Sequence, residues 1–88
     1  MKKSRILKEL EGLAQDLSIS VIYDRINGQG GYCRLKEKHY IIINSSLSLE
    51  RKIEILAEGL KTFPLDRIYL KPRLREIIEG KFSRSEGR

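Results

Sequence analysis

The sequence predicts an α+β domain in which helices pack on one face of a three-stranded antiparallel sheet, in the order α-β-β-β-α-α. Two observations support this prediction. Apolar residues recur with helical spacing before residue 18 and after residue 48, and they alternate as in strands between these points. The links between successive strands are short, which favours an antiparallel meander with the helices gathered on one side.

The first helix is predicted over residues 4–17, where apolar side chains follow one another at i, i+1, i+4, i+7, i+8 and i+11. The pattern then changes to alternation over residues 18–24, which predicts the first strand. A flexible loop should follow, because Asn27-Gly28 is a turn signal and Gly30 and Gly31 tolerate positive φ angles.

Residues 31–36 and 39–44 predict a hairpin whose loop is Glu37-Lys38. In this register one face of the hairpin is expected to pack on the core, and it consists of Cys33, Leu35, Tyr40 and Ile42. The other face mixes apolar and basic side chains, so it is either partly covered, a dimer surface or a ligand surface. We take it as a candidate interaction surface made of Tyr32, Arg34, Lys36, His39, Ile41 and Ile43.

Two further helices are predicted after the hairpin. The segment 44–48 supplies several N-caps for a helix over residues 49–62, whose core stripe is Leu49, Ile53, Leu56, Ala57 and Leu60. Pro64 ends this helix, and Pro72 begins a last one that ends before Gly80 and turns Leu74, Ile77 and Ile78 inward. Residues 1–80 are therefore expected to form one small domain, and residues 81–88 a disordered tail.

Composition places limits on the function. The chain has 88 residues, of which 18 are basic and 12 acidic, giving a net charge of +6 and a pI near 9.7. This charge is compatible with nucleic-acid partners, and equally with a role in solubility alone. The longest apolar run, residues 40–43, is far too short for a membrane span, and the single Cys33 cannot form an internal disulfide. We therefore expect a cytoplasmic protein that does not enter membranes.

A second group of basic and aromatic residues surrounds the last connection. Arginine and lysine can pair with phosphates while tyrosine stacks on bases, as in proteins that bind single strands. The alternative is a solvated charged rim, and the hairpin strand 31–35 does not reproduce the glycine-aromatic core of an RNA-recognition strand. The candidate nucleic-acid-binding residues are Arg67, Tyr69, Lys71, Arg73 and Arg75.

No catalytic or cofactor-binding set can be assembled from these residues. Cys33 and His39 are the only soft metal ligands, and the predicted register places them on opposite faces of the hairpin. The chain offers no pairing of an acid with a base and no activated nucleophile. We expect no enzymatic activity, no metal and no cofactor.

The segment Ala57-Glu58-Gly59-Leu60-Lys61 resembles the active-site helix of ImmA/IrrE-type zincin metallopeptidases. In that family a strand and a polar turn lead into a helix with the motif His-Glu-x-x-His, and here only Glu58 matches. Ala57 and Lys61 stand where the histidine ligands would be. The resemblance implies a sheet packed on the 49–62 helix, a lost protease activity and a scaffold used for binding, and it carries over no catalytic residue.

These observations predict a non-catalytic interaction module. Its candidate surface, or an exposed strand edge, would be covered by a protein partner or by a second copy of the chain. The alternative is a small nucleic-acid-binding protein that uses the basic and aromatic residues of the last connection.

Overall fold

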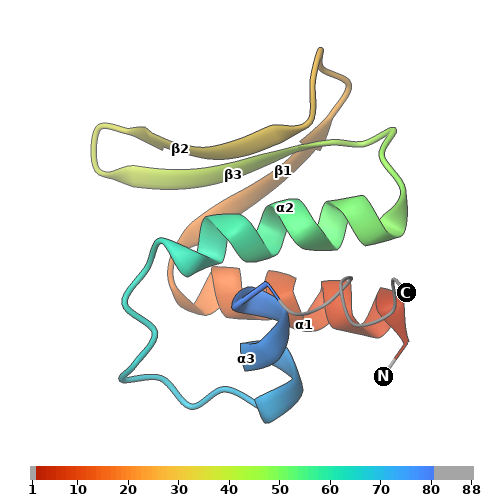
Figure 1. Cartoon of the computed structure of the whole chain (residues 1–88). Helices are drawn as coiled ribbons and strands as arrows, with labels where there is room; N and C mark the ends of the chain where they lie inside the picture. The colour runs from red at the N-terminus through yellow and green to blue at the C-terminus, as the bar shows by residue number, and fades with distance from the viewer. Residues whose placement is uncertain (1, 81–88) are drawn as a thin grey trace.

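The computed structural model describes residues 2–80, and the predicted tail at 81–88 lies outside this range. Figure 1 shows a sheet that forms one layer, with all three helices on one side of it. The predicted order α-β-β-β-α-α is confirmed, and the elements are α1 (Lys3–Asp16), β1 (Ile19–Asp24), β2 (Gly30–Leu35), β3 (Lys38–Asn44), α2 (Leu49–Lys61) and α3 (Pro72–Ile78).

The sheet is mixed, so the prediction of a purely antiparallel meander is wrong. Its strand order is β1-β3-β2, with β3 parallel to β1 and antiparallel to β2. The strand with the longest apolar run, β3, takes the central place, where it has a hydrogen-bonded neighbour on both sides. The loop 25–29 carries the chain past it, and the Asn44 amide fastens this loop by donating to the carbonyls of Ile26 (3.0 Å) and Gly28 (2.7 Å).

The hairpin between β2 and β3 turns one residue earlier than predicted. Its loop is Lys36-Glu37, and Lys36 has a φ of 60°, the left-handed conformation that tight hairpin turns require. As a result Leu35 pairs with Lys38 and Cys33 with Tyr40. The pairing differs from the predicted one by two residues, so every side chain keeps the face that the sequence predicts for it.

The two faces of the hairpin are nevertheless inverted relative to the core. Ile41 and Ile43 are fully buried, whereas Cys33 and Leu35 are exposed. The cause is the parallel pairing with β1, which places Ile41 beside Val21 and thus on the face that meets the helices. The predicted core face is therefore the outer face of the sheet.

Helix α2 lies against the inner face of the sheet and also against α1. Ser48 caps it, with its Oγ accepting from the Arg51 amide at 3.2 Å. Leu49 was predicted in the core but is 37% exposed, while the other predicted core residues are buried. Ile55 and Gly59 are also buried, because this helix has neighbours on two sides and not one.

The last helix follows its prediction closely. α3 begins at Pro72 and buries Leu74, Ile77 and Ile78, and Gly80 beyond its end has a φ of 89°. α3 packs on α2 and α1. Among the described residues no helix has both the length and the apolar composition that a membrane crossing requires.

Candidate interaction surface

The side of the sheet that faces away from the helices carries apolar side chains from all three strands. We call this side the outer face. Leu35 is 62% exposed and Ile22 is 40% exposed, and no described helix or loop covers them (Figure 1). The apolar members of the outer face are Ile22, Cys33, Leu35, Tyr40 and Ile42.

These side chains form a continuous group because the strand register places them side by side. Ile22 of β1 is the neighbour of Ile42, and Tyr40 is the neighbour of Cys33. Cross-strand neighbours on one face lie about 5 Å apart, close enough for their side chains to touch. The free thiol of Cys33 thus lies within the apolar group, near the middle of β2.

The two ends of the outer face differ in charge. At the hairpin end a hollow is lined by Leu35, Lys36, Glu37, Lys38 and Tyr40. At the opposite end the carboxylate of Asp24 accepts from the backbone N–H of Arg25 at 2.7 Å. Lys36, Lys38 and Asp24 form no ion pair with any other described residue.

Four members of the predicted interaction surface do come together on the inner side of the hairpin. Tyr32 Oη and His39 Nδ1 share a hydrogen bond of 2.6 Å. Arg34 is paired with His39 across the strands, and its Nε donates to the Lys36 carbonyl at 2.8 Å. The remaining two members are absent from this surface, because Ile41 and Ile43 are fully buried.

Phe63, which sequence reasoning missed, completes an aromatic cluster with Tyr32 and His39. Its ring centroid lies 5.6 Å from that of Tyr32 and 5.1 Å from that of His39, edge to face in both cases. The Tyr32 and His39 rings are stacked with centroids 5.9 Å apart. The three rings therefore cover part of one another's surface. The cluster lies just beyond the end of α2.

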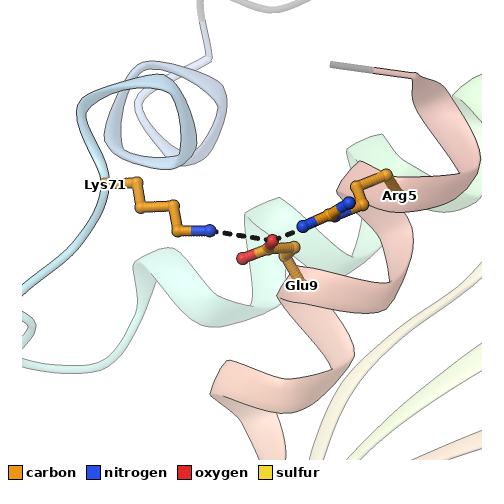
Figure 2. Close-up of polar contacts among 3 residues, drawn as sticks. All are labelled: Arg5, Glu9 and Lys71. Carbon is orange, nitrogen blue, oxygen red and sulfur yellow. Dashed lines mark hydrogen bonds and ion pairs between the residues drawn. The ribbon is translucent and has the colours of Figure 1, made fainter.

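The candidate nucleic-acid-binding residues are partly neutralised by carboxylates. Figure 2 shows Lys71 and Arg5 converging on Glu9 of α1. The Lys71 Nζ lies 2.9 Å from Glu9 Oε2, and the Arg5 Nε lies 3.4 Å from the same oxygen. The bond from Lys71, helped by that from Arg5, holds the pKa of the Glu9 carboxyl below its usual range.

The rest of this group is spread over the last connection. Arg73 pairs with Glu76 at 3.6 Å, and Tyr69 is 82% exposed beside a hollow whose lining includes Glu9 and Asp16. Arg67 and Arg75 are exposed. Because carboxylates alternate with the bases, the surface is not uniformly basic, and nucleic-acid binding stays a prediction.

The zincin-like segment lies at a shallow groove between β2 and α2. Glu58 lines this groove together with Arg51, which bonds to the side chains of Gln29 and Glu54. Ala57 is buried and has no donor atom, and Lys61 carries an ammonium group where a ligand would stand, so these residues do not fit a zinc ion. Within residues 2–80 no three His, Cys, Asp or Glu side chains gather as metal ligands.

Comparisons of the chain with protein-family models, with curated proteins and with solved structures found no match. The resemblance to ImmA/IrrE-type zincins thus stays a prediction. The function has to be argued from the geometry of this chain alone.

Proposed function

We propose that this protein is a non-catalytic interaction module that binds another protein surface through the outer face of its sheet. The observation that carries the proposal is the position of the helices, which all lie on the other side, so that within residues 2–80 Ile22, Cys33 and Leu35 stay exposed. A three-stranded sheet normally gains its stability by covering apolar faces. An apolar face left open on a small domain is typical of interaction sites.

The size of the outer face sets the expected strength of binding. Strands of six or seven residues give a length of about 20 Å, and three strands give a width of about 14 Å, or roughly 280 Å² in all. If all of this area were apolar, burying it would contribute about 7 kcal/mol of transfer free energy, which is comparable to the cost of association of about 4–15 kcal/mol. Ser20, Asp24 and Lys38 take up part of the face, so the true contribution is smaller. Contacts at the outer face alone thus support weak and reversible binding.

Two features of the groove near α2 support the non-catalytic part of the proposal. Glu58 is an exposed carboxylate, and none of the groove residues is a histidine or a cysteine that could act with it as a base or a nucleophile. Arg51, the basic residue of the groove, bonds to the side chains of Gln29 and Glu54. We propose that this groove has a structural role.

Site-specific photo-cross-linking in living cells tests the proposal. A benzophenone amino acid replaces Leu35 on the outer face or, as the matched control, Tyr69, which is exposed on the helical side. We expect an adduct of discrete mass from position 35 and little from position 69. Adding Ile22→Glu, which places a charge on the same face, should reduce the adduct. Equal cross-linking from both positions, or none from position 35 in folded protein, would contradict the proposal.

A further inference from the structure

We propose that the surface covering the outer face is the outer face of a second copy of this chain, stacked with its strands antiparallel. This inference rests on the proposed function and names its partner. Three features carry it, namely the charges at the ends of the face, the arrangement of the apolar side chains and the area of the face.

The charges at the two ends are opposite, and they form no ion pair with another described residue of the same copy. Lys38 points outward at the start of β3, and Asp24 points outward at the end of β1, about 20 Å away along the strands. On the helical side, by contrast, bases such as Lys3 and Lys71 are paired with carboxylates. The outer face thus has an excess of positive charge at its hairpin end, where Lys36 and Lys38 flank Glu37, and the Asp24 carboxylate at its other end.

Symmetry then restricts how two such faces can meet. In a face-to-face dimer whose strands are aligned, the two-fold axis lies between the sheets, either along the strands or across them. An axis along the strands brings Lys38 of one copy to Lys38 of the other, where like charges repel. An axis across the strands reverses their direction and brings the Lys38 end of each copy over the Asp24 end of the other. The charges therefore select the antiparallel stacking.

The apolar side chains are compatible with this arrangement. An axis across the strands keeps β3 over β3, so Tyr40 of one copy faces Ile42 of the other, as in the inner layer of a β-sandwich. It also keeps β2 over β2. Cys33 lies near the middle of that strand, so the thiols of the two copies come close to each other.

The area predicts a weak dimer. Two faces of roughly 280 Å² bury about 600 Å² in total, below the 1,200 Å² or more of stable complexes. We therefore expect a dissociation constant of about 10 µM to 1 mM. The net charge of +6 does not prevent this association, because the bases of α1, α2 and α3 lie on the side away from the contact.

Sedimentation equilibrium of the full chain tests the proposal. From about 1 µM to 2 mM, a range that spans the expected dissociation constant, the mass should rise from 10.2 kDa towards twice that value. Leu35→Glu should weaken the dimer at least about tenfold, because it places a charge in the contact. Leu49→Glu is the matched control, since Leu49 is an exposed leucine on the helical side, and it should change nothing. A monomer at the highest concentration would overturn the proposal.

Charge exchange tests the orientation of the two copies. Lys38→Glu and Asp24→Lys should each weaken the dimer, and the double variant should restore it, because the ends again carry opposite charges. Single variants that dimerise as well as the wild type, or a double variant that stays as weak as the single ones, would contradict antiparallel stacking. A bismaleimide should also join the two Cys33 thiols in the wild type and much less in Leu35→Glu.

These results separate the two proposals. If the purified protein stays monomeric while position 35 cross-links to a different protein in cells, the second copy is rejected and the interaction module stands. If position 35 gives no adduct with any protein, the interaction module is rejected as well.

Discussion

At the scale of single residues, two backbone positions set the register on which the site depends. Gly30 has a φ of 111°, and a Cβ there would lie 1.9 Å from the Ile42 carbonyl oxygen, so only glycine fits. Lys36 has a φ of 60° at the hairpin turn. The positive φ angle of Gly30 could be predicted, because this residue belongs to a glycine-rich loop signal. That of Lys36 could not, because lysine carries no turn signal and adopts this conformation only when strand pairing imposes it.

Long-range polar contacts are equally hard to predict from sequence. Glu9 and Lys71 are 62 positions apart, and nothing in either segment indicates that α1 and the last connection meet (Figure 2). Lys71, which the sequence predicts to bind nucleic acid, instead links the last connection to α1 through this ion pair. Its pH dependence follows from the lowered pKa of Glu9.

We predict that Lys71→Met destabilises the protein at pH 7 by an amount that disappears in acid. The pKa of Glu9 is lower in the folded state than the unfolded value of about 4.3, so the bond stabilises the fold above that value. The stabilisation is lost as the pH falls through the folded pKa. Urea unfolding from pH 7 down to the limit of folding measures this, with Lys8→Met on the exposed side of α1 as the control. A difference that does not vary with pH would contradict the role of Glu9.

At the scale of elements, amphipathic patterns predict which residues share a face but not which face is covered. Alternation correctly groups Cys33 with Leu35 and Ile41 with Ile43. Whether a group points inward depends on which strand lies beside β3, and that is a property of the whole sheet. The pattern of α2 is equally incomplete as a guide to burial. Gly59 is buried on a second side of the helix, which packs on the sheet face that alternation did not assign to the core.

We predict that Gly59→Ala destabilises the protein although alanine favours helices. An added Cβ would lie 2.7 Å from Ile41 Cδ1, and Ile41 is fully buried. Overpacking of about 1–3 kcal/mol should outweigh a helix gain of about 1 kcal/mol. Gly12→Ala is the control, since a Cβ there meets nothing within 4 Å, and it should stabilise by about 0.5–1 kcal/mol.

A second substitution identifies the cause of this effect. Ile41→Val removes Cδ1, the atom closest to the added methyl group. In denaturant unfolding it should cost less in the Gly59→Ala background than in the wild type, because it relieves the overlap. Equal costs in both backgrounds, or a Gly59→Ala variant as stable as Gly12→Ala, would show that α2 and the sheet do not meet this closely.

At the scale of the whole molecule, the sequence predicts the number, type and order of the elements and the gathering of helices on one side. The arrangement of the strands was beyond it, because the pairing of β1 with β3 joins segments about 20 residues apart and has no local signature. The strand arrangement also decides which side chains are available for binding. Parallel pairing of β1 with β3 turns Ile41 and Ile43 inward, and it leaves Cys33 and Leu35 on the outer face.

The measurement that tests this account most directly is the alkylation rate of the only cysteine, Cys33, in dilute native protein. The outer face exists only if this side chain is exposed. We predict that a maleimide modifies Cys33 in the folded protein at a rate close to that of the urea-unfolded chain, because the thiol meets solvent directly. A rate that is much slower, and that rises only with unfolding, would place Cys33 in the core. That result would contradict the register, the outer face and both proposals built on it.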